Sequence, residues 1–212
     1  EHSLSHDHTT FVFEDRGGTV WVGTWDGLAR WDPAASGFIR YRNQPYDPDS
    51  LSDNQPLTMV EDRAGSLWIG TFGHGINRLD PGQLKFAHYR LDPQAPDGVQ
   101  NNIVFGLLQD QQGVIWIGTV AGLNSLDRVA GELQRFRHDP ADPDSLGPGT
   151  IRALLEDSRG ALWVGTDQSL DRWDAASGGF DHFRIPAASA EAQGPVTALA
   201  ESWQGGLWVG VS

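Results

Sequence analysis

Glu61-Asp62-Arg63-Ala64-Gly65-Ser66-Leu67-Trp68-Ile69-Gly70-Thr71 is the stretch that decides the fold, because its pattern occurs five times in the 212 residues. Its tryptophan recurs in the words VWVGT, LWIGT, IWIGT, LWVGT and LWVGV, at Trp21, Trp68, Trp116, Trp163 and Trp208. The separations of 47, 48, 47 and 45 residues match the period of β-propeller blades and exceed that of ankyrin or leucine-rich repeats. The repeat therefore predicts a propeller.

A turn signature precedes each tryptophan. Three residues before it stands a glycine, at Gly18, Gly65, Gly113, Gly160 and Gly205, and six residues before it stand Asp15, Asp62, Asp110, Asp157 and Ser202. An aspartate side chain can accept hydrogen bonds from backbone N–H groups two or three residues later, and glycine supplies the positive φ of a tight hairpin. We expect a hairpin at each copy.

Strands are predicted on both sides of this hairpin. The strand before it is apolar on both faces and carries small residues such as Gly106, Ala153 and Ala198, which fits the innermost strand of a blade. The tryptophan strand comes second, and its indoles are expected to pack between adjacent blades. Third and fourth strands follow at motifs such as Ile76-Asn-Arg-Leu-Asp80 and Phe86-Ala-His-Tyr89.

The fold class is therefore all-β, with four-stranded antiparallel blades, about four and a half of them, in a partial or open ring. The boundaries lie near 8–45, 55–92, 102–139 and 150–185, and a fifth blade starts near 195–212. Because five copies of the first two strands accompany four copies of the last two, we expect a piece of one propeller from a longer protein.

The composition limits the kinds of partner that this chain could bind. Fifteen basic and 28 acidic residues give a formal charge of −13, which argues against nucleic acid and anionic membrane surfaces. No stretch approaches the roughly 20 apolar residues of a membrane span. Cysteine is absent from the sequence, which excludes disulfides and thiolate metal sites. We expect no cofactor and no direct membrane insertion of this segment.

The consensus resembles the two-component regulator propeller repeat, most closely from Leu51-Ser52-Asp53-Asn54 through Glu61-Asp62 and Leu67-Trp68-Ile69-Gly70-Thr71 to Arg78-Leu79-Asp80-Pro81. The resemblance implies an extracytoplasmic, periplasmic sensor region of a bacterial inner-membrane signalling protein. It implies a cytoplasmic histidine kinase or diguanylate cyclase, and often an oligosaccharide ligand. The remaining blades and signalling domains of the same protein would be its partners, and a homodimer is left open.

Candidate ligand residues lie in the loops that line one face of a propeller, between the second and third strands and before each first strand. They are Trp25 and Asp26, Phe72 and His74, and Asp167 and Gln168. An aromatic ring beside a carboxylate suits a sugar, because the ring stacks on the pyranose and the carboxylate accepts hydroxyl hydrogens. The alternative is that they are loop residues packing on neighbouring blades.

Several arginines and asparagines have two interpretations. Arg152 stands at the head of an inner strand, so it either faces a ligand or the channel or pairs with a neighbouring acid. Arg30, Arg78 and Arg172 recur once per blade, which favours ion pairs between blades. Asn54, Asn101 and Asn102 are expected to cap their own turns.

Other chemistry has weaker signals. His6-Asp7-His8 is too short a motif to specify a metal site, and the acidic runs 47–50 and 139–145 favour solvated turns over calcium loops. A propeller glycosidase or lyase is the alternative function and needs two carboxylates about 5 to 9.5 Å apart. Asp26 and Asp167 are the loop acids that qualify. A protein-binding scaffold is the third class.

Overall fold

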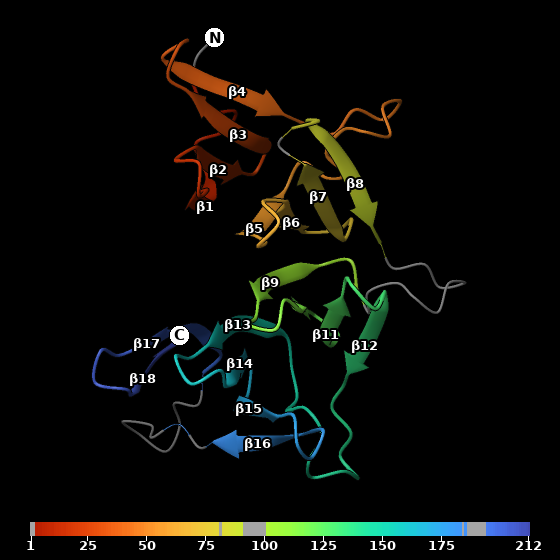
Figure 1. Ribbon diagram of the computed structural model, residues 1–212, viewed down its shortest axis with the longest axis vertical. Helices are drawn as coiled ribbons and strands as arrows, with labels where there is room; N and C mark the ends of the chain where they lie inside the picture. Colours follow the sequence, from red (N-terminus) through yellow and green to blue (C-terminus); the bar gives the residue numbers. More distant parts are fainter. Residues whose placement is uncertain (1–2, 81, 91–100, 184, 186–193) are drawn as a thin grey trace. The chain divides into compact units, whose positions relative to one another are not determined.

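The computed structural model describes residues 3–80, 82–90, 101–183, 185 and 194–212. Within these residues the chain forms eighteen β-strands in four four-stranded sheets and one two-stranded sheet (Figure 1). The pairs are antiparallel, and strands that follow one another in the chain lie side by side. The predicted all-β class with four-stranded blades is confirmed. The chain divides into two compact units, Glu1–Leu107 and Leu108–Ser212, which are described separately.

Each sheet takes its strands in chain order, and we call each sheet a blade. Blade 1 holds β1 (Thr9–Glu14), β2 (Val20–Thr24), β3 (Gly27–Asp32) and β4 (Gly37–Tyr41). Blade 2 holds β5 (Pro56–Glu61), β6 (Leu67–Thr71), β7 (Ile76–Asp80) and β8 (Lys85–Tyr89). Blade 3 holds β9 (Val104–Gln109), β10 (Ile115–Thr119), β11 (Gly122–Asp127) and β12 (Glu132–Phe136). Blade 4 holds β13 (Ile151–Glu156), β14 (Leu162–Thr166), β15 (Leu170–Asp174) and β16 (Gly179–Phe183). Blade 5 holds β17 (Val196–Glu201) and β18 (Leu207–Val211). Among the described residues no helix is long and apolar enough to cross a membrane.

The hairpin between the first two strands of a blade is organised by the predicted aspartate. In blade 2, Asp62 Oδ1 accepts the N–H groups of Ala64 and Ser66, both at 2.9 Å. The bonds therefore reach two and four residues along, where two or three were expected. Gly65 has a φ of 83°, and its four counterparts have φ between 80° and 92°, so the left-handed turn position predicted for glycine is confirmed.

The same aspartate also accepts a hydrogen bond from the tryptophan, a contact beyond the predicted turn. The Trp68 indole Nε1 donates to Asp62 Oδ2 at 2.8 Å, and the equivalent bonds of Trp21, Trp116 and Trp163 measure 2.9, 2.7 and 2.9 Å. One carboxylate thus accepts hydrogen bonds from the backbone N–H groups of the turn and from the indole N–H. In blade 5, where Ser202 replaces the aspartate, Trp208 is 70% exposed.

The cores lie where one blade packs on the next, as expected for the indoles. In the first unit Trp21 of blade 1 shares a buried cluster with Leu67, Leu79 and Phe86 of blade 2. In the second unit Trp116 of blade 3 shares a cluster with Leu162 and Phe180 of blade 4. The first strands of neighbouring blades also contact each other, β1 with β5 and β13 with β17, which supports their inner position.

The glycine two residues after the tryptophan lets the next blade approach in blades 2, 3 and 4. A Cβ on Gly70 would stand 2.7 Å from Val104 Cγ1, and one on Gly118 would stand 2.6 Å from Ile151 Cγ2. Both distances are shorter than any normal carbon contact. In these three blades the glycine of the WxGT word is therefore required by the first residue of the next blade rather than by a turn.

A second link between blades joins the end of the first strand of blades 2, 4 and 5 to the hairpin turn of the preceding blade. In blade 3 the equivalent residue is Gln109, whose side chain donates to the Gly113 carbonyl of its own hairpin at 3.1 Å. Glu61 Oε2 accepts the Arg16 N–H at 2.7 Å, and Glu156 Oε2 accepts the Gln111 N–H at 2.8 Å. The carboxylate of Glu201 accepts both the N–H and the hydroxyl of Ser158, at 2.8 and 2.6 Å. Glu156 Oε1, by contrast, is buried with no hydrogen-bond partner among the described residues.

The recurring arginines do not all bridge blades. Arg172 pairs with Asp181 at 2.6 Å across the β15–β16 ladder of its own blade, and its guanidinium lies over Trp163 and Phe183. The prediction of an ion pair between blades was wrong for Arg172, because the two strands that flank β15 in its own blade supply an acid and two aromatic rings. Arg30 lies over the Trp21 ring, 6.0 Å from its centroid.

Candidate functional site

The loop after each second strand is tied to the residue that precedes the first strand of the same blade. The N–H groups of Trp25, Phe72 and Asp167 donate to the carbonyls of His8, Gln55 and Thr150, at 3.1, 3.0 and 3.1 Å. These bonds bring together, in three blades, the two sets of loops from which the ligand residues were chosen. The same alignment puts His6 and His8 at the positions of Asp53 and Gln55.

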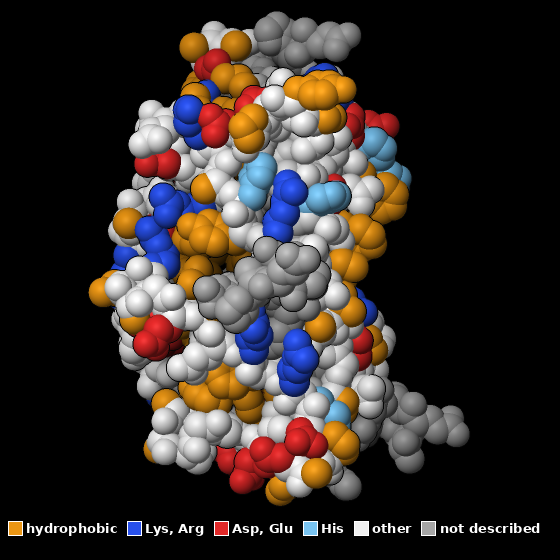
Figure 2. All heavy atoms as spheres, turned by 90° about the vertical axis from the view of Figure 1, so that its right-hand side faces the viewer, with side chains coloured by type: hydrophobic (Ala, Val, Ile, Leu, Met, Phe, Trp, Pro, Cys, Tyr) orange, Lys and Arg blue, Asp and Glu red, His pale blue; other side chains and the backbone are white. Residues whose placement is uncertain are grey.

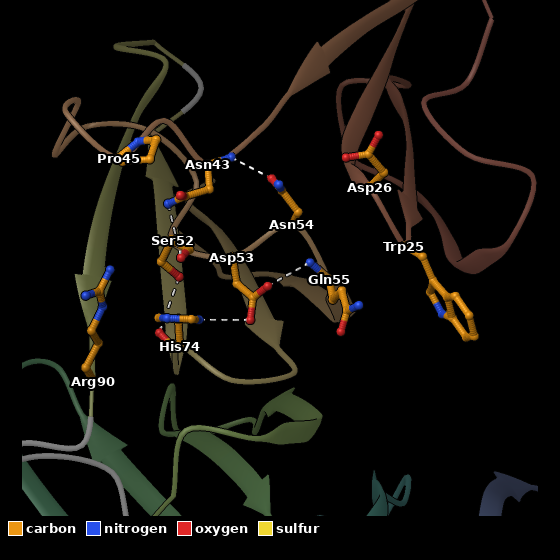
Figure 3. Close-up of a pocket in the computed structure, with 10 residues that line it drawn as sticks. All are labelled: Trp25, Asp26, Asn43, Pro45, Ser52, Asp53, Asn54, Gln55, His74 and Arg90. Atoms are coloured by element: carbon orange, nitrogen blue, oxygen red, sulfur yellow. Dashed lines mark hydrogen bonds and ion pairs between the residues drawn. The ribbon is translucent and has the colours of Figure 1, made fainter.

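The first unit has an open pocket of about 540 Å³ among these loops, which we call the chamber (Figure 3). Three predicted ligand residues, Trp25, Asp26 and His74, lie on its wall. In Figure 3 Trp25 and Asp26 stand on one side, and His74 groups with the polar side chains of the other. The remaining wall residues were not predicted as ligands, and they are Asn43, Pro45, Ser52, Asp53, Asn54, Gln55 and Arg90.

Both carboxylates of the chamber have partners. Asp26 is ion-paired with Arg42. Asp53 Oδ2 lies 3.1 Å from His74 Nδ1, and its Oδ1 accepts the Gln55 N–H at 3.0 Å. Arg90 supplies a further cationic group on the wall. The chamber is therefore polar and contains both signs of charge, which suits a ligand with hydroxyl or other hydrogen-bonding groups.

Trp25 supplies the exposed aromatic surface of this region. Its side chain is 54% exposed. The ring of His8 stacks on it with centroids 4.6 Å apart, and His6 stacks on His8 at 5.3 Å. The two histidines of the His6-Asp7-His8 motif thus support the indole. In the described part of the chain no three His, Cys, Asp or Glu side chains form a group that could hold a metal ion.

The asparagines fill different roles. Asn101 Oδ1 accepts the N–H of Ile103 at 2.7 Å, so the prediction that it caps its own turn is confirmed. Asn54 Oδ1 instead accepts the N–H of Asn43, eleven residues earlier, at 2.7 Å. That expectation was wrong for Asn54, because the preceding segment folds back against it. Asn43 could not have been found from the repeat, since its role depends on that path.

Phe72 is 48% exposed and is not part of the chamber wall. Its position in blade 2 corresponds to that of Trp25 in blade 1, through the matching backbone bonds to Gln55 and His8. It remains a predicted ligand residue.

In the second unit Arg152 forms an ion pair with Asp167. Of the two interpretations of Arg152, the structure shows the salt bridge to a neighbouring acid. Asp167 Oδ2 also accepts the Thr150 N–H at 3.1 Å. Burial alone would raise the pKa of Asp167, but the hydrogen bonds from Arg152 and Thr150 and the arginine charge hold it below its ordinary value. Gln168 donates its backbone N–H to Thr166 Oγ1 at 3.0 Å.

Comparisons with known proteins agree with the repeat. The family model described as two component regulator propeller matches residues 50–73, 98–121 and 145–168. No curated protein sequence matches the chain. Solved structures match it closely in fold at low sequence identity.

Two of these structures come from B. thetaiotaomicron and are extracellular domains. That of BT3049, described as a hybrid two-component system, has a TM-score of 0.84 and 22% identity over 100% of this chain and 28% of its own. That of BT4673 has a TM-score of 0.77 and 19% identity over 98% of this chain and 27% of its own. A catalytically inactive virginiamycin B lyase from Staphylococcus aureus has a TM-score of 0.68 and 18% identity over 97% of this chain and 64% of its own.

The chain thus spans about 28% of the length of the first structure it matches. At this level of identity the structures establish the fold, and the family model establishes the repeat. The family model matches three of the five copies of the motif in the sequence. The chain therefore carries the repeat of the two-component regulator propeller family in the fold of a β-propeller.

Proposed function

We propose that this chain is a ligand-sensing β-propeller segment of a bacterial signal-transduction protein, acting on the extracytoplasmic side of the inner membrane. The proposal is supported by the repeat family and by the fold that the chain shares with the extracellular domains of BT3049 and BT4673. In the full-length protein a histidine kinase or a diguanylate cyclase on the cytoplasmic side would read out the bound state.

The ligand would be a carbohydrate or another small polar molecule, and the observation that carries this is the chamber of about 540 Å³ in the first unit. Its volume lies in the range of small-molecule sites. The Trp25 indole offers one stacking face, and His74, Asn54 and Arg90 offer hydrogen-bonding groups on the wall. Asp26 would accept a hydroxyl hydrogen in addition to its bond with Arg42.

The segment itself would not be catalytic. Asp26 and Asp167, the two loop acids, are each engaged by an arginine. The pKa of Asp167 is lowered, which makes it a poor general acid near neutral pH, whereas glycoside cleavage requires one carboxyl group to be held protonated.

Calorimetric titration of the purified chain against an oligosaccharide panel tests the binding proposal. We expect one or more members to bind, and Trp25→Ala to weaken that binding at least tenfold through loss of the stacking face. Trp203→Ala is the matched control, because Trp203 is a 91% exposed indole in the blade 5 turn, outside the chamber wall. Equal losses in both variants, or silence of the whole panel, would contradict the carbohydrate assignment.

The signalling assignment has a separate test. The full-length coding sequence should contain a membrane-spanning segment followed by a kinase or cyclase domain. A full-length protein that lacks these parts would remove the sensor interpretation and leave a binding or scaffold propeller.

A further inference from the structure

One position of the fourth strand holds the segment that leads into the same blade. In blade 1 Arg40 donates to the carbonyl of Ser3 at 3.0 Å. In blade 2 His88 Nε2 lies 2.7 Å from the carbonyl of Ser50, and in blade 4 His182 Nε2 lies 3.0 Å from the carbonyl of Pro143. The side chain is therefore a clamp between the outer strand and the incoming segment, repeated from blade to blade.

The residue paired with this clamp on the third strand differs between blades 2 and 4. Asn77 faces His88 and accepts the Ser52 N–H at 2.8 Å. Asp171 faces His182 and accepts the Gly147 N–H at the equivalent place, also at 2.8 Å. Asp171 is fully buried, and its other oxygen lies 2.8 Å from His182 Nδ1. Blade 4 thus has a buried carboxylate where blade 2 has a neutral amide.

The groups that face each ring differ between the two blades. Both nitrogens of His182 face groups that accept hydrogen bonds, the Asp171 carboxylate and the Pro143 carbonyl, and an imidazolium, with hydrogen on both nitrogens, satisfies both contacts. His88 Nδ1 instead lies 3.4 Å from the Arg90 guanidinium, which can only donate, so the ring faces one acceptor and one donor. We propose that His182 is a proton-operated clamp that holds the segment before blade 4 when charged and releases it when neutral.

The surroundings of His182 favour the charged state. Burial alone would lower the pKa of His182, but the hydrogen bond and charge of Asp171 and the carbonyls of Pro143 and Ser145 raise it above its ordinary value. The incoming segment also carries Asp139, Asp142 and Asp144, and β16 carries Asp181, which is paired with Arg172. Figure 2, which shows the right-hand side of Figure 1, has acidic side chains gathered at its lower end. The segment between β12 and β13 runs at this end in Figure 1.

The pH dependence follows from the sign of the shift. Because the pKa of His182 is raised in the folded state, its stabilisation is complete below about pH 6.5, the unfolded value, and disappears as the pH rises through the folded value. Above that pH the buried Asp171 loses its counter-charge. A buried charge without a partner is unfavourable, so the Gly147 contact is expected to open.

Opening of the Gly147 contact would affect the predicted ligand residues of blade 4, which are Arg152, Asp167 and Gln168. The residues after Gly147 are bonded to the loop that carries Asp167, since Thr166 Oγ1 donates to the Pro148 carbonyl at 2.8 Å and the Thr150 N–H donates to Asp167 at 3.1 Å. Asp167 in turn holds Arg152. The effect on a ligand rests on the proposed function, whereas the clamp itself does not.

The test uses the full chain without ligand, so its outcome is independent of sugar binding. Imidazole NMR should show His182 titrating above pH 6.5, and hydrogen exchange should show the protection factor of the Gly147 amide falling through the same pH. The fall should be about tenfold for each unit by which the folded pKa exceeds the unfolded one.

Two variants drawn from the other blades complete the design. Asp171→Asn installs the blade 2 residue and should abolish the raised titration and the pH-dependent loss of protection. His182→Arg installs the blade 1 residue and should keep Gly147 protected at high pH. A His182 titration at or below 6.5, or one unchanged by Asp171→Asn, would overturn the proposal, as would equal pH dependence of Gly147 in His182→Arg.

Discussion

Replacing Asp62 by alanine should be among the most destabilising single changes in the first unit. The carboxylate is fully buried and accepts three hydrogen bonds, from Ala64, Ser66 and the Trp68 indole. Ala64 is exposed, so water can replace its lost bond. Ser66 and Trp68 are buried, and each unsatisfied buried donor costs about 1–3 kcal/mol. Two such donors predict a loss of about 4 kcal/mol in the free energy of unfolding.

Asp157 provides the matched control, because it makes the same bonds in blade 4. Its partners Ala161 and Trp163 are only half-buried, so water can reach them and Asp157→Ala should cost about 1–2 kcal/mol. Equilibrium urea unfolding followed by circular dichroism measures both variants against the parent chain. If Asp62→Ala costs no more than Asp157→Ala, the buried carboxylate is not what organises the hairpin, and the reasoning fails.

Three further outcomes follow from the packing and the charges. Gly70→Ala should destabilise the first unit by about 1–3 kcal/mol, since its Cβ would stand 2.7 Å from Val104. The double variant with Val104→Ala should lose less stability in urea unfolding than the sum of the two single variants. Strict additivity of the two losses would rule out the contact. Gln111→Ser should stabilise the second unit by about 1 kcal/mol by giving Glu156 Oε1 the hydroxyl that Ser158 gives Glu201; an unchanged urea midpoint would contradict this. The melting temperature should fall as the pH drops below about 4. The folded state lowers the pKa of three aspartates of the second unit, so their contribution to the free energy of unfolding is lost when they become protonated. A melting temperature that stays constant from pH 5 to pH 2 would refute this prediction. These aspartates are Asp157, Asp167 and Asp174.

The sequence predicted the features that repeat. Strand order, the glycine of the turn and the packing of Trp21 and Trp116 between blades follow from a motif whose copies lie in register. The hydrogen bond between Asp62 and Trp68 was also available from the sequence, because the constant spacing of six residues across a hairpin places the two side chains on one face. It was missed because the aspartate was assigned to the turn alone.

The features that do not repeat were harder to predict. The Asn43–Asn54 bond depends on how the segment after blade 1 folds back, and the contact of His182 with the Pro143 carbonyl depends on which acceptors the incoming segment presents. Arg172 was assigned to the wrong neighbour, since a one-dimensional pattern does not tell whether the nearest acid lies on the facing strand or the next blade. The chamber residues contributed by segments between blades escaped prediction for the same reason.

The bonds of the turn and the contacts between blades differ in how far they reach along the chain. The aspartate, glycine and tryptophan of a turn lie within seven residues, so a duplicated or transplanted blade takes its hairpin with it. The junction depends on one glycine meeting the first residue of the next strand and one glutamate meeting the preceding turn. A blade that presents these two residues therefore makes the contacts that join blade 4 to blade 3 and blade 5 to blade 4.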